Sequence, residues 1–370
     1  MKKVILTIVA LLFLAACAQP EIETKPIKIG VAAPLTGPLS FFGEWMREGF
    51  ELALEEVNVA GIDGRKVELI YEDTICLPKE ATTALSALDA KDAVAMLGPF
   101  CGSEVQAAAS WAEQNKKVTI SPGNNFGKLS EYFFNTEHLI ADESKFLADF
   151  AYQKGFRKIA IIGINNDWGQ MHRDSFTNHF ETLGGKVVAA ELFNQDTETD
   201  FRTYLTKIKA ASPDAIFIAF SRPALIINQI HELFGTEIAI FGERGLQHQG
   251  TLDVAGKNAD GLLYSYPGKS TEITPTQQKF GENYKTKYSK EPHLVVAQSY
   301  DALKILAMAL NACIEEQFSS DCLSNYVQQM KDYDGARGRI TYEGTFWNMK
   351  IPFHMKMIKN GTFVQMEVKI

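Results

Sequence analysis

Two short segments carry groups that could hold a small anion. In Gly98–Val105 (GPFCGSEV), a helix is predicted to begin near Gly102 and Ser103, directly after a strand. The free backbone N–H groups and the positive dipole end of such a helix attract a carboxylate, and the dipole alone contributes about 0.3–1 kcal/mol. Ser103 could instead serve only as the N-cap, with Glu104 favouring the first turn. The segment therefore predicts either an anion site or an ordinary helix start.

The segment Ser121–Asn125 (SPGNN) also follows a predicted strand. Asn124 and Asn125 carry side-chain amides that could bind a ligand. Proline, glycine and asparagine are also the residues that favour a simple turn. Both interpretations stay open from the residues alone.

The sequence lacks the common motifs of catalysis and of metal binding. It has no Gly-x-Ser-x-Gly elbow, phosphate loop or Gly-x-Gly-x-x-Gly. Seven histidines are scattered; His172 and His179 could share a helix face, but such a pair is usually found on the surface. No Cys-x-x-Cys or clustered Cys/His spacing favours a metal. We therefore expect no enzyme, no catalytic residue, no metal and no cofactor.

Charge and size limit the partners and the architecture. The formal net charge of −8 disfavours nucleic acid and anionic lipid surfaces as partners. The chain has 370 residues, which is too long for one ordinary core and comfortable for two domains. A small ligand remains possible, because the charges within its binding site, and not the net charge of the protein, determine whether it binds.

The N-terminus predicts export and a lipid anchor. Lys2 and Lys3 precede an uncharged run, Val4–Ala16, of 13 residues, whereas a bilayer-spanning helix needs about 20. A basic start, a short apolar core and small residues describe a secretory signal. Leu-Ala-Ala-Cys resembles the lipobox of prokaryotic lipoproteins, which implies cleavage before Cys17 and a lipid on its thiol.

Residues 1–16 are then the signal peptide, and 17–26 are the lipidated cysteine and a polar leash. Two other interpretations stay open. The segment could be a plain secretory signal with an incidental cysteine, or a buried helix of a cytosolic domain.

The cysteines predict two disulfides. Without Cys17, an even number remains in an oxidising compartment, and four cysteines allow three pairings. Sequence proximity favours Cys313–Cys322, which leaves Cys76–Cys101. Cys76 and Cys101 each follow a predicted strand, and adjacent parallel strands would bring those strand ends together. A metal site is the weaker alternative.

Predicted strands and helices alternate along most of the chain. We expect strands at 27–35, 66–73, 93–100, 118–122, 158–165, 186–193, 214–220, 238–242, 261–267, 339–342, 351–358 and 362–368. We expect helices at 43–58, 79–90, 103–115, 142–155, 169–184, 201–210, 223–234, 276–288, 295–316 and 323–331. Apolar strands alternating with helices indicate an α/β protein with parallel sheets covered on both faces. Two doubly wound domains would place a ligand at the carboxyl ends of their strands, in the cleft between them.

Several segments resemble one family when taken together and in order. These are IKIGVAAPLTGPLSFFGEWMREGFELALEEVN, YEDTICLPKEA, LGPFCGSEVQAAASWAEQNKKVTISPGNN and DYDGARGRITYEGTF. They resemble the leucine/isoleucine/valine-binding family of periplasmic substrate-binding proteins, from about Ile27 to the C-terminus.

The resemblance implies two doubly wound parallel-sheet domains joined by three hinge crossings, the Venus flytrap fold. We expect domain one at 27–140 and 269–335, and domain two at 141–268 and 336–370. The resemblance also supports the Cys76–Cys101 bridge.

The resemblance further implies roles for individual residues. The family places a serine hydroxyl on the ligand carboxylate where this chain has Gly102, beside Ser103. Trp168 matches an aromatic position above the ligand, although it could simply be a core residue. Glu243 matches an acid that pairs with a ligand ammonium, although it could be a solvated glutamate paired with Arg244.

Further site residues are expected around these. The loop Ser121–Asn125 resembles the family's loop that offers backbone N–H groups and a side chain to the carboxylate end of the ligand, so Asn124 and Asn125 are candidates. Ser221 and Arg222 follow another strand, where the family often has an aromatic residue, and Arg222 could recognise a second acidic group. Phe42 and Phe100 could line the pocket from domain one. The expected ligand site therefore joins donors on one domain to an acid and an aromatic residue on the other.

The implied function is capture of a small ligand, most simply an amino acid, and delivery to an ABC permease and its ATPase. The expected protein is an extracytoplasmic, lipid-anchored monomer. A ligand that is an amide or a small organic acid stays open, because Gly102 lacks the hydroxyl and Arg222 is present. A sensory ligand-binding protein stays open too, because the same fold serves both roles.

Overall fold

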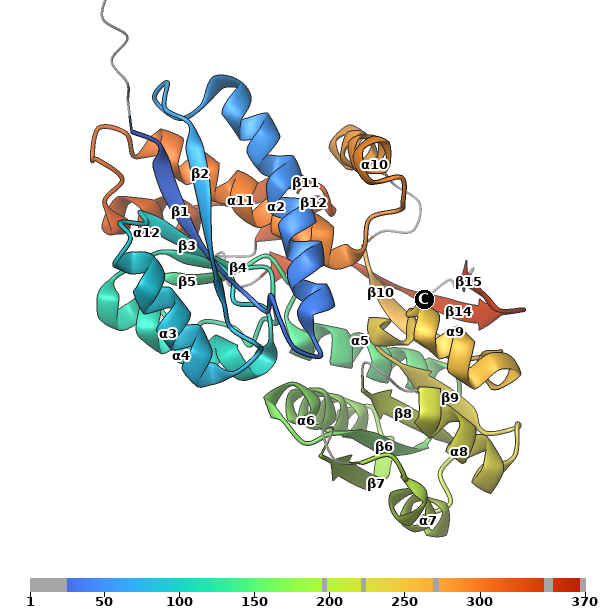
Figure 1. The fold of residues 1–370 in the computed structure, drawn as a ribbon. Helices are drawn as coiled ribbons and strands as arrows, with labels where there is room; N and C mark the ends of the chain where they lie inside the picture. Colours follow the sequence, from blue (N-terminus) through green and yellow to red (C-terminus); the bar gives the residue numbers. More distant parts are fainter. Residues whose placement is uncertain (1–24, 195–197, 221–223, 269–272, 343–348, 367–370) are drawn as a thin grey trace, which may run out of the picture.

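Two layered α/β units lie beside each other in the computed structural model (Figure 1). The structure describes residues 25–194, 198–220, 224–268, 273–342 and 349–366. We call the unit around the sheet that begins with β1 the first lobe, and the unit around the sheet that begins with β6 the second lobe.

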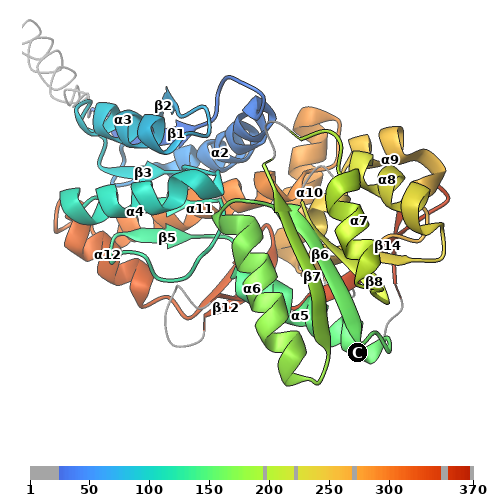
Figure 2. The same ribbon diagram turned by 90° about the horizontal axis from the view of Figure 1, so that it is seen from below.

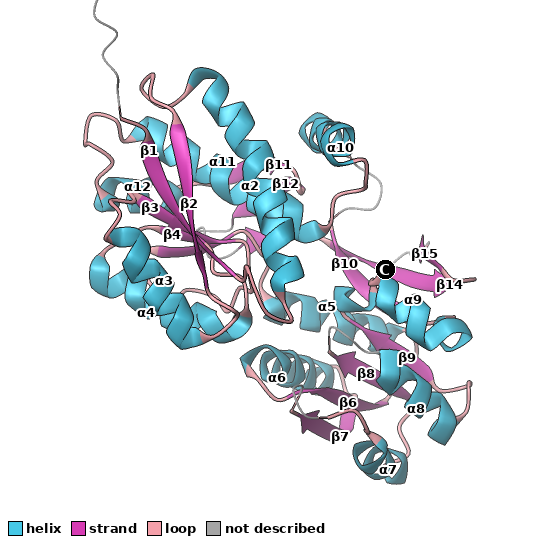
Figure 3. Ribbon diagram, viewed as in Figure 1, coloured by secondary structure: helices cyan, strands magenta, loops and turns pink. Residues whose placement is uncertain are grey.

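The first lobe is built on a parallel sheet of five strands in the order β2-β1-β3-β4-β5. The strands are β1 (Ile27–Ala33), β2 (Val67–Asp73), β3 (Ala95–Leu97), β4 (Thr119–Ser121) and β5 (Phe133–Asn135). Its helices are α2 (Ser40–Ala60), α3 (Pro78–Asp89), α4 (Gly102–Asn115), α10 (Pro275–Tyr288), α11 (Leu294–Ala312) and α12 (Ser320–Gln328). Figure 3 shows the strands of this sheet between helices.

Alternation along β1 explains why both faces of this sheet are covered. Ile29 and Val31 join a core with α2 and α11, whereas Ala32 joins a separate core with α3 and α4. Successive side chains of a strand point to opposite faces, so one apolar run supplies both cores. Gly49 lets α2 and α11 approach closely, because a Cβ there would lie 2.2 Å from the Val296 carbonyl oxygen.

The second lobe has a sheet of seven strands in the order β15-β14-β10-β9-β8-β6-β7. The strands are β6 (Lys158–Ile164), β7 (Lys186–Phe193), β8 (Ala215–Ala219), β9 (Ala239–Gly242), β10 (Leu263–Pro267), β14 (Phe353–Lys359) and β15 (Thr362–Gln365). Its helices are α5 (Ile140–Gln153), α6 (Asp167–Thr182), α7 (Arg202–Ala210), α8 (Ala224–Phe234) and α9 (Gln249–Ala255), with 3₁₀ turns at Arg244–Leu246 and Gly256–Ala259. Helices α5 and α6 cover one face and α7, α8 and α9 the other (Figure 2).

The order of the elements takes the chain back and forth between the lobes. It leaves the first lobe after β5, returns after β10, and enters the second lobe again before β14. A small antiparallel sheet of β11 (Asp332–Gly335), β12 (Gly338–Tyr342) and β13 (Met349–Lys350) precedes that last crossing. Ala336 and Ile351 pack in the core of the first lobe. The expected α/β fold with two sheets and three crossings is confirmed.

Several local expectations need correction. β2 and β3 are not neighbours, because β1 lies between them. β14 pairs antiparallel with β10, so the second sheet is not wholly parallel. The helix expected to reach Glu316 ends at Ala312, and Cys313 is its C-cap. The short strands β5 and β11 and the helix α9 were not predicted.

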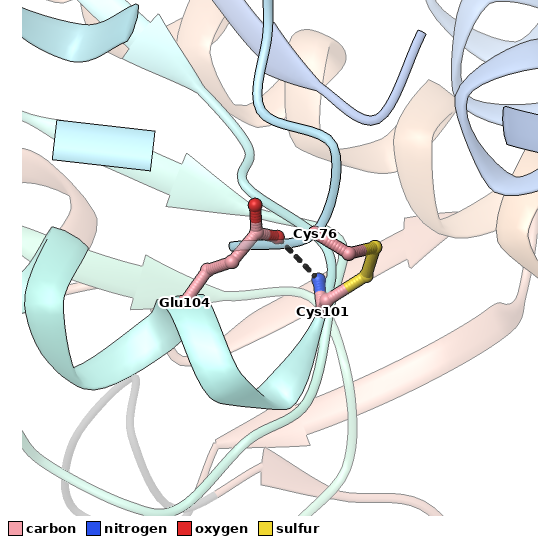
Figure 4. Close-up of side chains that lie close together, drawn as sticks. All are labelled: Cys76, Cys101 and Glu104. Atoms are coloured by element: carbon pink, nitrogen blue, oxygen red, sulfur yellow. Dashed lines mark hydrogen bonds between the residues drawn. A yellow bond between two sulfur atoms is a disulfide. The ribbon is translucent and has the colours of Figure 1, made fainter. Parts of the chain in front are cut away.

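Both expected disulfides are present. The Cα atoms of Cys76 and Cys101 lie 5.5 Å apart, and those of Cys313 and Cys322 lie 6.0 Å apart. Figure 4 shows Glu104 beside the first bridge, where its Oε2 accepts a hydrogen bond from the Cys101 N–H at 3.0 Å. The sulfurs are bonded to each other, so this cluster offers no thiolate to a metal.

We expect the Cys76–Cys101 bridge to stabilise the protein more than Cys313–Cys322. The sequence separations are 25 and 9 residues. Loop-closure entropy then predicts losses of about 3.5 and about 2.6 kcal/mol when each pair is replaced by alanine. Urea unfolding of the two double variants measures this. A larger loss from the shorter loop would contradict the entropic account.

Candidate ligand-binding cleft

A cleft of about 1010 Å³ lies between the two lobes. Its walls come from loops at the carboxyl ends of β1, β2, β3 and β4 in the first lobe and of β6, β7, β8 and β9 in the second, and from the segment that joins α10 to α11. Parallel α/β sheets bind ligands at this end, because helix N-termini and loop amides gather there. In the part of the chain that the structure describes, no helix is long and apolar enough to cross a membrane.

The start of α4 forms one side of the cleft. Gly102 is the first residue of α4, as expected, and both Gly102 and Ser103 line the cleft. Ser103 is not the N-cap, because Cys101 takes that place and Glu104 completes its capping box. The Ser103 hydroxyl donates to the Cys76 carbonyl at 3.1 Å, so it ties two loops together.

Gly102 lies close to two other expected site residues. A Cβ at Gly102 would be 3.1 Å from Asn124 Nδ2 and 3.7 Å from Trp168 Cβ. Asn124 belongs to the first lobe and Trp168 to α6 of the second lobe, and both line the cleft. The fold thus brings Gly102, Asn124 and Trp168 together, and the missing side chain at Gly102 leaves room between them.

Asn125 does not line the cleft. It is 2% exposed, its Nδ2 donates to the Glu137 carbonyl at 2.8 Å, and its Oδ1 accepts from the Gly127 N–H at 2.9 Å. These bonds hold the loop that precedes the first crossing. Its side chain therefore has a structural task, and we leave it out of the proposed site.

Trp168 serves the core and the cleft together. It is 7% exposed, belongs to the core of the second lobe, and also lines the cleft. Its ring packs edge-to-face on His172 at 4.4 Å between centroids. At the same helix start, Asp167 accepts a hydrogen bond at 3.0 Å from Gln106 of α4, in the first lobe.

Glu243 lies directly after β9 and faces the cleft from the second lobe. It is 2% exposed. Its Oε2 accepts from the Gly245 N–H at 2.6 Å, whereas its Oε1 has no hydrogen-bond partner among the described residues. Burial and the nearby charge of Glu143 raise the pKa of Glu243 to about 7. A buried carboxylate oxygen without a partner is costly unless a ligand supplies one.

Arg244 does not pair with Glu243, which corrects that alternative. Its Nη2 donates to Glu137 at 2.8 Å and its Nη1 to Glu143 at 3.2 Å. Arg337 also bonds Glu137, so one carboxylate at the first crossing joins cations from both lobes. Burial would raise the pKa of Glu137, but Arg244, His138 and Arg337 hold it well below its usual range.

The cleft contains residues that sequence reasoning missed. Phe42 and Phe100 line it as expected, and Phe41, Trp45, His293 and Gln298 join them. Gln298 is fully buried on α11, and its Oε1 has no partner among the described residues. His293 caps α11, and burial lowers its pKa to about 4.

Some expected residues cannot be placed. Ser221, Arg222 and Cys17 lie outside the described residues. The neighbouring Phe220 is described, is 8% exposed and lines the cleft. The described part of this loop therefore adds an aromatic ring to the second-lobe wall.

Two α/β lobes joined by several crossings around a polar and aromatic cleft define a two-lobed solute-binding protein. The sequence profile described as "Periplasmic binding protein" matches residues 26–361. The chain belongs to this family of extracytoplasmic solute-binding proteins, in its type I, leucine/isoleucine/valine-binding branch.

Individual relatives agree over most of their length. The leucine-, isoleucine-, valine-, threonine- and alanine-binding protein of Pseudomonas aeruginosa is 23% identical over 309 residues, 81% of this chain and 82% of that protein. The crystal structure of a leucine-binding protein from Thermotoga maritima has a TM-score of 0.82 and 27% identity, covering 92% of this chain and 97% of that one. A Streptococcus pneumoniae branched-chain amino acid binding protein in complex with isoleucine has a TM-score of 0.80 and 25% identity, covering 91% and 97%.

Proposed function

We propose that this protein captures an amino acid in the cleft between its lobes and delivers it to an ABC permease. The observation that carries the proposal is Glu243, a buried carboxylate with one oxygen unpaired at the cleft. An α-ammonium group supplies the missing hydrogen bond and the opposite charge. The relatives that bind leucine, isoleucine and valine support the same ligand class.

The ligand carboxylate is proposed to lie at the start of α4, on the first lobe. There the N-terminal end of the helix favours a negative charge, and Gly102, Ser103 and Asn124 line the cleft. The ammonium then lies at Glu243 on the second lobe, beside Trp168. Because its two charged ends contact different lobes, the ligand binds the closed form more tightly and draws the lobes together.

We also propose the domain bounds, the lipid anchor, two further site residues and the transport partners. The expected domains, 27–140 with 269–335 and 141–268 with 336–370, are proposed with one change: because Ala336 and Ile351 pack in the core of the first lobe, the last boundary lies just before β14. Cys17 carries a lipid that tethers the protein to a membrane. Ser221 and Arg222 complete the second-lobe wall, and the permease and its ATPase receive the ligand from a monomeric binding protein.

An organic acid without an amine is the less favoured ligand. Such a ligand leaves Glu243 unpaired and needs a free cation. Arg244 lines the cleft, but its guanidinium is bonded to Glu137 and Glu143. The described walls of the cleft therefore favour a zwitterion. A sensory protein with the same ligand would share this site and differ only in its partner.

Thermal melting of ligand-free protein tests the proposal. The chain from Ala18 onward is unfolded and refolded to remove carried-over ligand, and is then melted with amino acids, their amides and small organic acids. A ligand at 100 times its Kd adds about 2.7 kcal/mol of stability. We expect a rise in Tm with α-amino acids. A rise only with acids that lack an amine would contradict the proposal.

A further inference from the structure

We infer that the ligand of this cleft carries a flat, uncharged aromatic side chain. The inference rests on the proposed function, because it takes the amino acid backbone as held by the α4 start and Glu243. It is carried by five rings on the first-lobe side of the cleft. We call them the aromatic wall: Phe41, Phe42, Trp45, Phe100 and His293.

The rings of the aromatic wall contact one another in series. Phe42 lies 4.5 Å from Phe100, 4.3 Å from Phe41 and 5.7 Å from Trp45 between ring centroids. Trp45 stacks on His293 at 3.8 Å with an interplanar angle of 17°. These spacings are those of favourable aromatic pairs. The wall is therefore one continuous aromatic surface.

Three separate segments position the wall. Phe41, Phe42 and Trp45 lie in the first two turns of α2, where residues three and four apart share a face. Phe100 precedes the bridged Cys101, and His293 caps α11. The backbone of these five residues is thus positioned by helices, a helix cap and a disulfide that do not involve a ligand.

The position of the aromatic wall relative to the proposed carboxylate site indicates that the wall contacts the ligand side chain. Phe100 is two residues from Gly102, at the start of α4. The α-carbon of an amino acid carries a carboxylate, an ammonium group and a side chain. When the carboxylate lies at that helix start and the ammonium at Glu243, the side chain is left to contact the aromatic wall. Phe100 is the ring of the wall nearest to this helix start along the chain, and Phe42 contacts it at 4.5 Å between ring centroids.

The charged residues beside the wall already have partners and give an ionic side chain no dedicated counter-charge. Lys290, at the same edge of the cleft, pairs with Glu48 at 2.7 Å, and Glu291 pairs with Lys285. His293 is neutral near pH 7, because burial lowers its pKa to about 4. No charge among the described residues of the wall remains to neutralise an acidic or basic ligand side chain.

An aromatic box around a cation is the competing interpretation. A cation needs open ring faces that surround it. Here Trp45 has one face covered by His293, and the phenylalanine rings lie tilted on one another at 31° and 39°. A surface of this kind suits a flat apolar group, which can stack on one ring and meet the edge of another.

Titration calorimetry on the refolded, ligand-free protein tests the inference. The ligands are L-phenylalanine, L-tyrosine, L-tryptophan, L-leucine and glycine betaine. We expect at least one aromatic amino acid to bind about tenfold or more tightly than L-leucine. L-leucine that binds as tightly as all three aromatic amino acids overturns the inference and leaves the proposed function standing. Binding of glycine betaine alone, or of no ligand, overturns both.

Two substitutions separate stacking from general packing. Phe42→Leu is expected to weaken the best aromatic ligand about tenfold and L-leucine less than about threefold. Phe41→Leu provides a second position if the first variant does not fold. The matched control is Phe234→Leu, on α8 in the second lobe and outside the cleft lining. Equal losses for the aromatic ligand and for L-leucine would contradict an aromatic specificity.

Discussion

Replacing Glu243 by glutamine is expected to weaken amino acid binding at least tenfold, or about 1.4 kcal/mol. The substitution keeps the shape of the side chain and an oxygen for the Gly245 N–H, which now bonds Oε2 at 2.6 Å. It removes the negative charge that we assign to the ligand ammonium. Calorimetry with the best ligand measures the change.

The same substitution is expected to stabilise the ligand-free protein at high pH. Burial and Glu143 raise the pKa of Glu243 to about 7, above its value in an unfolded chain. The contribution of Glu243 to stability is therefore fully present below the unfolded pKa of about 4.3 and is lost as pH rises through about 7. Glutamine does not ionise, so the variant should melt higher than the parent at pH 8 and show no such loss.

The pH dependence of binding has the opposite direction. An ammonium ligand needs the ionised carboxylate, so affinity should fall as the pH is lowered from 8 to 6. The control is Glu237→Gln, an exposed glutamate in the same lobe. Unchanged affinity in Glu243→Gln, or equal effects in the two variants, would remove Glu243 from the site.

Replacing Arg244 by methionine is expected to lower the free energy of unfolding by about 3–5 kcal/mol. Arg244 bonds Glu137 and Glu143, whose carboxylates are 2% and 0% exposed. Without the guanidinium, these two carboxylates remain buried with less positive charge to compensate them. Urea unfolding at pH 7 measures the loss.

A surface arginine provides the comparison for Arg244. Arg173 bonds Asp174 at 2.6 Å on the exposed face of α6, and an exposed pair contributes little. Arg173→Met should therefore change the free energy of unfolding by less than about 1 kcal/mol. Similar losses in the two variants would show that the buried pairs of Arg244 contribute no more to stability than an exposed ion pair.

Local patterns were enough to predict the class of fold. The alternation of apolar strands and amphipathic helices is a property of neighbouring residues, and most elements lie where the pattern placed them. β5 (Phe133–Asn135) was missed because polar residues flank it, Glu131 before it and residues 136–138 after it, so the sequence shows no distinct apolar run there. Strand order is not a local property, so the pattern did not show that β1 separates β2 from β3.

The site was predicted only where residues follow strands in recognisable segments. Glu243 and Trp168 were identified in this way, with the family resemblance. Gln298 and His293 follow no strand, and they reach the cleft because α11 packs beside α2. Their partners are also distant in sequence; Gln298 bonds Glu137, 161 residues away.

The capping of α4 shows a different limit. The preference for serine at an N-cap favoured Ser103, but Cys101 takes that place because its backbone is extended there and Glu104 completes the capping box. Cysteine is not among the usual capping residues. A residue fixed by a disulfide can therefore override a capping preference.

The central claim is that an amino acid bridges the lobes through both of its charged groups. The most direct test is calorimetry of the ligand-free protein with the best amino acid, its deaminated acid and its decarboxylated amine. We predict that the amino acid binds and that each analogue binds at least about tenfold more weakly. The deaminated acid leaves Glu243 without a partner, and the decarboxylated amine leaves the start of α4 without one. A deaminated acid that binds as tightly as the amino acid would contradict the central claim.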